Sequence, residues 1–259
     1  MAEVHPCCLT IAGSDSGGNA GVQADLRAFH AYGLHGCTVF AALTAQNPRG
    51  VSAIHSVPPD FVAAQLDAVL GVYEIRALKT GMLADPAVIE VVAGRIAAYP
   101  EIARVVDPVM IATSGAKLAA NDAVEAMKRR LLPVATVITP NMPEAEALCG
   151  HAGPSVELAR ELHGRFGCAV VVKGGHGRGE CAVDVLCDAV GEIREFDMPW
   201  VRNPASTHGT GCTFAAALAA ELAIGRGMAE AVAGAKRHVH DAIAGSYFVG
   251  EGCGVLGFA

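Results

Sequence analysis

The sequence contains little charge for its length. Only 17% of the 259 residues are charged, whereas 52% are hydrophobic, which is the composition of a globular chain with a large buried core. The formal net charge is -7 at pH 7, and the basic run at residues 128–130 is typical of the solvated end of a helix. Because a nucleic-acid partner usually requires a basic face, we expect no nucleic-acid binding.

Long apolar runs are also missing. A membrane-spanning helix requires roughly 20 consecutive apolar residues, and the longest apolar runs of this sequence are far shorter. The opening residues, MAEVHPCCLT, lack the basic segment followed by an apolar segment that marks a signal peptide. These absences lead us to expect a cytoplasmic protein with no membrane partner.

No C-x-x-C pair occurs among the nine cysteines, which removes a common spacing of zinc and redox sites. An odd number of cysteines, scattered through apolar segments of a chain without a signal peptide, predicts reduced and buried thiols. Cys212 is the exception because it stands directly before the long apolar helical run at residues 213–225.

The chain does contain a regular alternation of apolar, β-branched runs and helical patterns. The runs occupy residues 7–13, 35–43, 75–81, 104–109, 135–141 and 168–175. Between them, apolar residues at 62, 66, 69, 70 and 73 have helical spacing. This alternation predicts an α/β fold with three α/β/α layers around a doubly wound, mostly parallel sheet.

The rest of the expected organisation follows from turns and composition. Residues 181–198 alternate around a turn at 190–192, which predicts an antiparallel hairpin at the edge of the sheet. Two helices, at about residues 211–225 and 228–246, are expected to close the chain. No Pro/Gly/Ser linker, internal repeat or low-complexity tract occurs, so we expect residues 1–259 to form a single domain.

Polar residues or glycines follow six of the expected strands, where a packed sheet does not require them. They occupy residues 14–21, 45–47, 79–82, 107–108, 141–144 and 173–176. Ligands of doubly wound sheets bind beyond the carboxyl ends of the strands. We therefore expect these segments to surround one binding site.

The stretch HGTGC, residues 208–212, has the character of an anion site. It enters a helix, where unpaired N–H groups and the positive end of the helix dipole favour an anion. Gly209 and Gly211 allow the backbone to approach a ligand closely. The P-loop pattern G-x-x-x-x-G-K-[ST] is absent, so the chain is not expected to be a P-loop NTPase.

Four further residues suit phosphate chemistry. Asp107, Asn141 and Glu144 carry hard oxygen atoms that could hold Mg²⁺ and its waters. Lys173 could supply a positive charge to a phosphate. An anion site, oxygen ligands and a lysine at one edge of a sheet predict phosphoryl transfer, which depends mostly on positioning and charge stabilisation.

Seven motifs, in chain order, resemble the hydroxymethylpyrimidine and phosphomethylpyrimidine kinases of thiamine biosynthesis, a branch of the ribokinase superfamily. They are GSDSGGNAGVQADL, TAQNPRGV, KTGML, DPVMIATSG, ITPNMPEAE, VVVKGGH and HGTGCT. The resemblance extends from Leu9 to the final helix. It implies a ribokinase-like fold, ATP and Mg²⁺ as cofactors, and a homodimer.

The resemblance also implies roles for individual residues. Asn141 and Glu144 would belong to the metal–phosphate motif. With the side-chain chemistry above, we expect Asn141, Lys173 and Thr210 to bind the nucleotide and Asp107 and Glu144 to bind the metal. The catalytic anion hole would consist of Gly209, Thr210, Gly211 and Cys212. The pyrimidine would lie against Gly13, Ala20, Asp25, Gln46, Met82 and Val109.

Two positions depart from the family pattern. Thr113 stands where several relatives have a lysine, which bears on one phosphate contact. Thr80 replaces a commonly apolar residue before Gly81, which bears on the floor of the pocket.

The side-chain chemistry agrees with a pyrimidine ligand. Gln46 offers one acceptor and two donors and Asp25 offers two acceptors, a combination that matches an aminopyrimidine edge. Met82 and Val109 would supply apolar walls for a flat ring. His176 and His208 are expected to be loop or surface residues, because nothing in the sequence pairs them.

Cys212 raises a question, because a carboxylate would be the usual base for an alcohol acceptor. The pKa of a thiol at a helix N-terminus can fall below its free value of about 8.5. We therefore hypothesise a thiolate during phosphorylation of the alcohol. Beside the phosphate monoester of a second phosphorylation, a neutral thiol would avoid the repulsion that a fixed carboxylate charge would cause.

The expected activity is ATP-dependent phosphorylation of 4-amino-5-hydroxymethyl-2-methylpyrimidine, and then of its monophosphate to the diphosphate. Two alternatives remain open. A pyridoxal-type vitamin B6 kinase would act on another hydroxymethylated heteroaromatic ring. A catalytically inert pyrimidine sensor would have lost Asn141, Glu144, Lys173 or the glycines of HGTGC, and the sequence retains all of them.

Overall fold

The computed structural model describes residues 5–110, 121–175 and 180–258, so Thr113 and His176 lie outside the described residues. The strands of its main sheet are β1 (Cys7–Asp15), β2 (His35–Asn47), β3 (Gly50–Ser56), β4 (Ile75–Thr80), β5 (Ala103–Val106), β6 (Val137–Ile138), β7 (Ala169–Val172), β8 (Cys181–Cys187) and β9 (Ile193–Pro199). They form one nine-stranded sheet in the order β3-β2-β1-β4-β5-β6-β7-β8-β9. From β2 to β7 the neighbours are parallel, whereas β3, β8 and β9 pair antiparallel, as the sequence predicted for the 181–198 hairpin.

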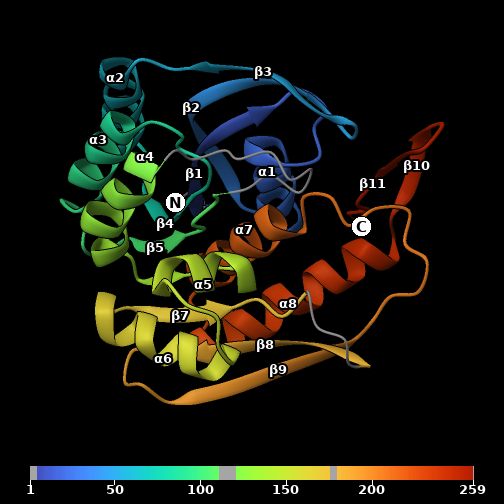
Figure 1. Ribbon diagram of the computed structural model, residues 1–259. Helices are drawn as coiled ribbons and strands as arrows, with labels where there is room; N and C mark the ends of the chain where they lie inside the picture. The colour runs from blue at the N-terminus through green and yellow to red at the C-terminus, as the bar shows by residue number, and fades with distance from the viewer. Residues whose placement is uncertain (1–4, 111–120, 176–179, 259) are drawn as a thin grey trace.

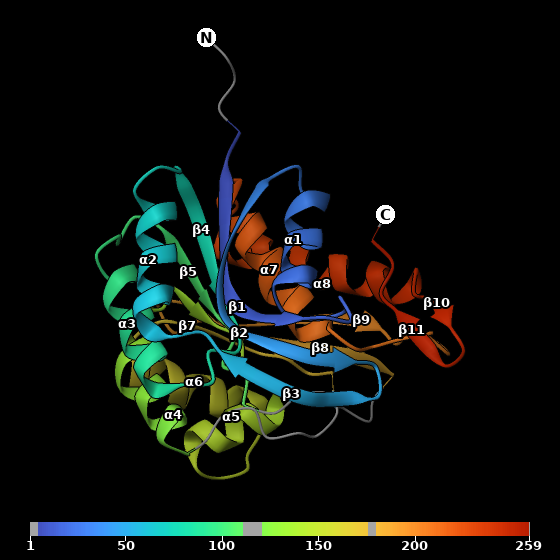
Figure 2. The ribbon, with the colours of Figure 1, turned by 90° about the horizontal axis from the view of Figure 1, so that it is seen from above.

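Helices cover both faces of this sheet (Figures 1 and 2). One face carries α2 (Pro59–Leu70), α3 (Pro86–Ile96), α4 (Asn121–Ala126), α5 (Met142–Cys149) and α6 (Ser155–Phe166). A π-helical segment (Met127–Leu131) and a 3₁₀ turn (Leu132–Val134) follow α4. The opposite face carries α1 (Gly21–Ala31), α7 (Thr210–Ala223) and α8 (Met228–Ala244). The predicted three-layer α/β/α fold is therefore confirmed.

Two separate cores form because successive side chains of a strand point to opposite faces. In β1, Leu9 and Ile11 pack with the core of α2 to α6, whereas Cys8 packs with the core of α1, α7 and α8. The predicted helix at 62–73 is α2, which buries Val62 and Leu66 and ends at Leu70.

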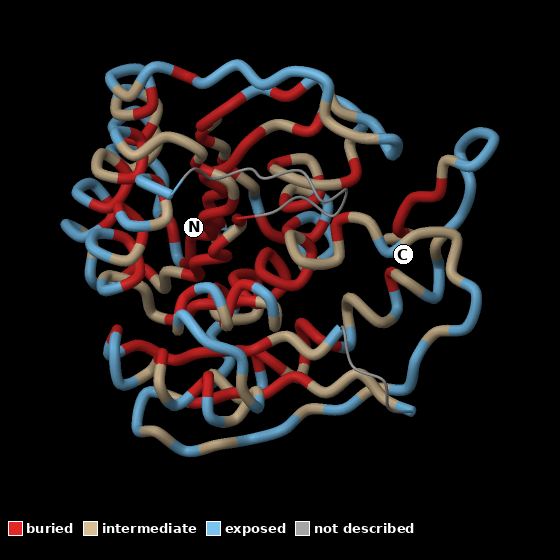
Figure 3. The backbone as a smooth tube through the Cα atoms, viewed as in Figure 1, coloured by how far each residue is buried: buried red, intermediate tan, exposed pale blue. Residues whose placement is uncertain are grey.

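The edges of the sheet and the end of the chain differ from expectation. Strand β3 extends the sheet beyond β2 as a hairpin that was not predicted, because β3 is mostly exposed and has no buried residue (Figure 3). After α8, a second hairpin pairs β10 (Tyr247–Gly250) with β11 (Cys253–Val255). The two helices predicted at about 211–225 and 228–246 are α7 and α8, but the chain does not close with them. The hairpin after α8 was not predicted, because its strands, which turn at Gly252 with φ 67°, are too short to show a clear period.

Helix α7 is the most deeply buried helix segment near the expected site. Alanines occupy most of its interior positions, and those from Ala215 to Ala220 that flank Leu218 have no solvent exposure. The helix contacts β1, β4 and β5 on one side and packs against α1 and α8. Its first turn, which contains the end of the HGTGC stretch, thereby lies at the carboxyl ends of the parallel strands.

All nine cysteines are free, and five of them are buried: Cys7, Cys8, Cys37, Cys168 and Cys187. Within the described ranges, no helix combines the length and the apolar character that crossing a membrane requires.

Candidate active site

A cavity of about 560 Å³ lies at the carboxyl ends of the parallel strands. One end is lined by residues of β1, β2 and the segment after β4, and the other by residues of β8, β9 and α8. Of the residues predicted for the site, those that line it are Gly13, Ala20, Gln46, Met82, Asp107, Val109, Asn141, Glu144, Lys173, Gly209, Thr210, Gly211 and Cys212. The remaining one, Asp25, does not line the cavity. The volume of the cavity is within the range of small-molecule sites.

The β1 end of the cavity has an apolar wall. A Cβ atom on Gly13 would lie 2.6 Å from Cε of Met82, so the absence of a side chain at position 13 lets the methionine lie against the strand. Val109 lines the cavity in the turn after β5, where its N–H donates to the carbonyl of Asp107 at 2.8 Å. These side chains provide the apolar surface that a flat heteroaromatic ring requires.

Gln46 brings polar groups to the same end. Its Oε1 accepts a hydrogen bond from the Thr44 hydroxyl at 3.2 Å, and its Nε2 lies 3.4 Å from Nε2 of His208. His208 is a loop residue, as expected, but its ring lines the cavity and its side chain is only 20% exposed. The sequence signal that could have identified it is its position at the start of HGTGC.

Asp15, which was not among the predicted site residues, organises the loop between β1 and α1. Its carboxylate accepts hydrogen bonds from the N–H groups of Gly17, Asn19 and Ala20 at 2.8 to 2.9 Å. Burial alone would raise the pKa of Asp15, but the His208 ring, whose Nε2 lies 3.8 Å from Asp15 Oδ2, and these three bonds hold it below its usual value. The charged carboxylate therefore fixes the loop that presents Ala20 to the cavity.

Asp25 lies beneath the cavity and is fully engaged by the protein. Both its carboxylate oxygens accept hydrogen bonds from Lys79 Nζ, at 3.0 and 2.9 Å, and one accepts a further bond from the Thr10 hydroxyl. Both side chains of the Lys79–Asp25 pair are 0% exposed. The prediction of a direct contact between Asp25 and a ring therefore does not fit this geometry, because the carboxylate has neither exposure nor a free direction.

Lys79 is the member of this pair that reaches the cavity. Burial would lower the pKa of its ammonium, but the Asp25 carboxylate raises it above its usual value, so Lys79 is charged. Burial also raises the pKa of Asp25, whereas the charge of Lys79 and the hydrogen bonds from Lys79 and Thr10 act against that rise. Such a buried pair places a fixed positive charge under the β1 end of the cavity.

The HGTGC stretch forms a backbone cradle at the start of α7. Gly209 has φ 88°, in the left-handed region, and a Cβ there would lie 1.9 Å from the carbonyl oxygen of Asn19. Glycine is therefore required for the loop to pack against residues 19–20. The carbonyl of Gly209 accepts from both the N–H and the hydroxyl of Thr213, which closes the first turn. The N–H groups at 210–212 are the ones that a helix start leaves without an intrahelical partner.

Cys212, at the end of the cradle, does not have the lowered pKa that its helix position suggested. Burial raises the pKa of its thiol, and the nearby carboxylates of Asp25 and Asp107 add to the effect. Lys79 and the N–H of Gly21 act in the opposite direction but do not outweigh burial. This direction gives no support to a thiolate during phosphorylation of the alcohol, and it agrees with a neutral thiol beside the phosphate monoester.

Lys173 and Asp107 face the cradle from the strand ends. Lys173 Nζ donates to Asp107 Oδ1 at 2.8 Å, and the Thr139 hydroxyl donates to the same oxygen at 3.1 Å. A Cβ on Gly211 would lie 3.5 Å from Lys173 Nζ and 4.0 Å from Asp107 Oδ2, so both groups border the cradle directly. Although burial opposes it, the carboxylates of Asp107 and Glu144 raise the pKa of Lys173, which keeps it charged.

Asn141 and Glu144 form a reciprocal capping box at the start of α5. The Asn141 side chain accepts from the N–H of Glu144, and Glu144 Oε2 accepts from the N–H of Asn141, each at 2.9 Å. Burial raises the pKa of Glu144 to about 7. A cation beside this carboxyl would favour its charged form. Two carboxylates with hard oxygens, from Asp107 and Glu144, are the donor chemistry that Mg²⁺ prefers while it keeps several waters.

Sequence comparisons match this chain to one family of kinases over nearly its whole length. Residues 15–257 match the family model for phosphomethylpyrimidine kinase. The chain is 45% identical, over 254 residues, to the hydroxymethylpyrimidine/phosphomethylpyrimidine kinase of Rhizobium meliloti, covering 95% of this chain and 94% of that protein. It is 46% identical over 250 residues to the thiamine biosynthesis bifunctional protein ThiED of Geobacter sulfurreducens, covering 95% of this chain but only 51% of that protein.

Solved structures are similar over nearly the same extent. Bacillus subtilis pyridoxal kinase, determined as an ADP complex, has a TM-score of 0.90 at 34% identity and covers 98% of both chains. Phosphomethylpyrimidine kinase from Clostridium difficile has a TM-score of 0.81 at 37% identity, covering 92% of this chain and 99% of that one.

Proposed function

Because the chain belongs to the phosphomethylpyrimidine kinase family, we propose that it transfers phosphate from ATP to 4-amino-5-hydroxymethyl-2-methylpyrimidine and then to the resulting monophosphate. The observation that carries this proposal is that one cavity connects an end lined by Met82 and Gln46, an apolar and an amide side chain, to the backbone cradle at residues 209–212. A ring at that end would present its hydroxymethyl group to the cradle.

The pyrimidine is assigned to the β1 end. Gln46 and His208 both line the cavity, with their Nε2 atoms 3.4 Å apart, and the pair would offer both donor and acceptor atoms to the ring. Met82 and Val109 would sandwich the apolar parts of the ring. Asp25 takes part through Lys79, which it holds in place, rather than by contact.

The nucleotide is assigned to the other end of the cavity. Apolar side chains from β9 and α8, including Met198, Val239 and Ile243, line it and suit an adenine ring. The phosphates would then extend toward Lys173 and the cradle N–H groups. The ADP complex of the Bacillus subtilis relative is consistent with a nucleotide ligand for this fold.

Charge stabilisation at the cradle would come from the protein's own groups. Lys173 would pair with phosphate oxygens, and the N–H groups at 210–212 would donate to the transferred group. Cys212 would close the cradle as a neutral thiol, which adds no negative charge beside a phosphorylated acceptor. Asp107 and Glu144 would hold Mg²⁺, which when bound would neutralise charge on the phosphates.

A vitamin B6 kinase is the second candidate, because the Bacillus subtilis pyridoxal kinase structure superposes at a TM-score of 0.90. Sequence identity favours the pyrimidine kinases, at 45% to 46% against 34%. Both rings carry a hydroxymethyl group, so the fold alone does not separate them.

A substrate panel tests the proposal. With ATP and Mg²⁺, we expect kcat/KM for the hydroxymethylpyrimidine to exceed that for pyridoxal by roughly tenfold or more, because a site built to hydrogen-bond one ring edge rejects another. The diphosphate should accumulate after the monophosphate, which anion-exchange chromatography of the products would resolve. A preference for pyridoxal, or a reaction that stops at the monophosphate, would contradict the proposal.

Gln46→Ala tests, in the same panel, whether the pyrimidine binds at the β1 end of the cavity. Loss of its amide should raise the KM for the pyrimidine roughly tenfold, because ring atoms lose their partners. The KM for ATP should stay unchanged, since Gln46 lies at the opposite end of the cavity. Equal increases in both constants would assign Gln46 to the fold rather than to the ring.

A further inference from the structure

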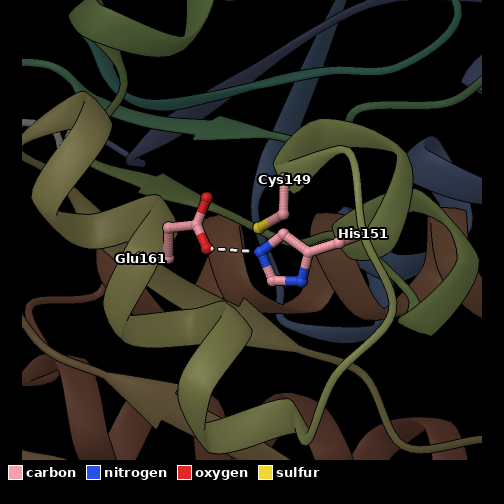
Figure 4. Close-up of side chains that lie close together, drawn as sticks. All are labelled: Cys149, His151 and Glu161. Carbon is pink, nitrogen blue, oxygen red and sulfur yellow. Dashed lines mark hydrogen bonds and ion pairs between the residues drawn. The ribbon is translucent and has the colours of Figure 1, made fainter.

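Three potential metal ligands meet on the surface at the junction of α5 and α6 (Figure 4). Cys149 is the last residue of α5, His151 lies in the following loop and Glu161 lies on α6. One ligand atom from each, a sulfur, an imidazole nitrogen and a carboxylate oxygen, lie within 4.8 Å of one another. None of the three lines the cavity described above, so this cluster is separate from the proposed kinase site.

The local backbone brings Cys149 and His151 together. Gly150 caps α5 with φ 88°, in the left-handed region, and its N–H donates to the carbonyl of Glu146 at 2.7 Å. This conformation reverses the chain directly between the cysteine and the histidine, so that both side chains face α6. The sequence pattern C-G-H is thus folded into a two-ligand turn.

Neighbouring groups orient the other two ligands. His151 Nδ1 lies 3.1 Å from the carbonyl oxygen of Ala152, while its Nε2 lies 2.8 Å from Glu161 Oε2. Arg165 donates to Glu161 Oε1 and to the carbonyl of Leu148, each at 2.6 Å, which leaves Oε2 directed at the histidine. A second hydrogen bond that fixes each ligand is the usual arrangement around a bound metal.

The same geometry argues against a nucleophilic triad. A cysteine nucleophile needs one imidazole nitrogen for its thiol and the other for the carboxylate. Here Nε2 faces Glu161 and Nδ1 is committed to a backbone carbonyl, so no nitrogen remains for a proton relay. A metal uses the cluster differently, because sulfur, Nε2 and Oε2 can all point at one ion.

We propose that Cys149, His151 and Glu161 form a binding site for Zn²⁺, with a water as the fourth ligand. Thiolate, imidazole and carboxylate are all zinc ligands, and three of them with an open position give the tetrahedral geometry that zinc adopts. Thiolate and carboxylate together balance the charge of the ion. Mg²⁺ takes oxygen ligands in an octahedron, so the magnesium that the kinase reaction uses should not compete.

Binding would tie the C-terminal end of α5 to α6. The N-terminal end of α5 carries the Asn141–Glu144 capping box, only eight residues away along one helix. The three ligands lie together only in the folded chain, so the ion would bind the folded state and not the unfolded one. Zn²⁺ should therefore raise the thermal stability of the protein. The ion would contribute to the fold and take no part in phosphoryl transfer.

Titration of the purified, reduced protein with Co²⁺ tests the site, because a cobalt–thiolate bond gives a charge-transfer band in the near ultraviolet. We expect the band to saturate at one equivalent, to be displaced by Zn²⁺ and to resist a large excess of Mg²⁺. Zn²⁺ should also raise the Tm of the parent. Absence of a saturating band, or its displacement by Mg²⁺, would overturn the proposal.

Two variants and one control assign the ligands. Cys149→Ser should abolish the band, and His151→Gln should weaken Co²⁺ binding roughly tenfold or more, because even the loss of a partner that orients a ligand typically costs about that much. Cys181→Ser removes another partly exposed thiol, on β8, and should leave the titration unchanged. Circular dichroism would verify that each variant is folded. A band that survives in Cys149→Ser, or disappears in Cys181→Ser, would show that the metal binds elsewhere.

Discussion

Replacing Lys79 with methionine is expected to lower the free energy of unfolding by about 3 to 5 kcal/mol, the range found when one partner of a buried ion pair is removed. The methionine matches the length of the lysine but leaves Asp25 without its two Nζ hydrogen bonds. Because Asp25 is 0% exposed, water cannot replace the lost partner. Urea unfolding at neutral pH would measure the difference.

A double variant separates the lost charge from the lost packing. Asp25→Asn combined with Lys79→Met removes both charges, while the oxygen of the new amide could still accept from Thr10, so most of the stability should return. Arg95→Met, which breaks an exposed pair with Asp67, should change unfolding far less. The interpretation fails if Lys79→Met is no worse than Arg95→Met, or if the double variant is as unstable as Lys79→Met.

Glu144→Gln is expected to reduce kcat by about 10²- to 10³-fold, because the variant loses a carboxylate that would hold Mg²⁺, and the ion would stabilise the charge of the transition state. The amide oxygen of glutamine can still accept from the Asn141 N–H, so the capping box and the helix start should persist. Only the charge near Lys173 and Asp107 is lost. Steady-state kinetics at saturating ATP and Mg²⁺ would measure the effect.

The stability of this variant should change in the opposite sense to its activity. Burial raises the pKa of Glu144 from 4.5 to about 7, so the folded state binds this proton more tightly than the unfolded state does. The free energy of folding that this proton contributes is therefore fully present below about pH 4.5 and is lost as the pH rises through about 7. Glutamine carries no charge to bury, so Glu144→Gln should be at least as stable as the parent at pH 8.

A neighbouring residue gives the control for both measurements. Glu146→Gln removes a less buried carboxylate on the same helix, and neither kcat nor the pH dependence of stability should respond. If Glu144→Gln keeps the parent kcat, or if it loses stability at pH 8, the assigned role of this carboxylate is wrong.

The sequence predicts the layered fold well because each βαβ unit carries a local signal. Apolar runs such as residues 7–13 and the helical spacing at 62–70 do not depend on distant residues. The β3 edge strand has no such signal, because an exposed ribbon buries no face. Its position depends on the continuation of β2 beyond the parallel sheet, which only the assembled fold determines.

The candidate site shows where local chemistry is insufficient. A carboxylate at position 25 suggests a ligand contact, but a lysine 54 residues away in sequence takes both its oxygens. A cysteine at a helix start suggests a low pKa, but burial among Asp25 and Asp107 reverses the direction. Both errors concern which groups surround a side chain, and that information is distributed over several strands. By contrast, Asn141 and Glu144 are three residues apart, and their mutual cap could be anticipated from the sequence alone.

The alanines of α7 act as spacers that set the height of the cradle. The distance between a helix and the elements beside it depends on the side chains at the contact, and methyl groups keep α7 close to β1, β4 and β5. The cradle is the first turn of α7 and moves with the helix. A bulkier residue on the buried side of α7 would therefore shift or tilt the cradle N–H groups relative to Asp107 and Lys173. The alignment of phosphate donor and acceptor thus depends partly on positions that no ligand contacts. A substitution at one of these positions can change activity although every residue of the site is retained.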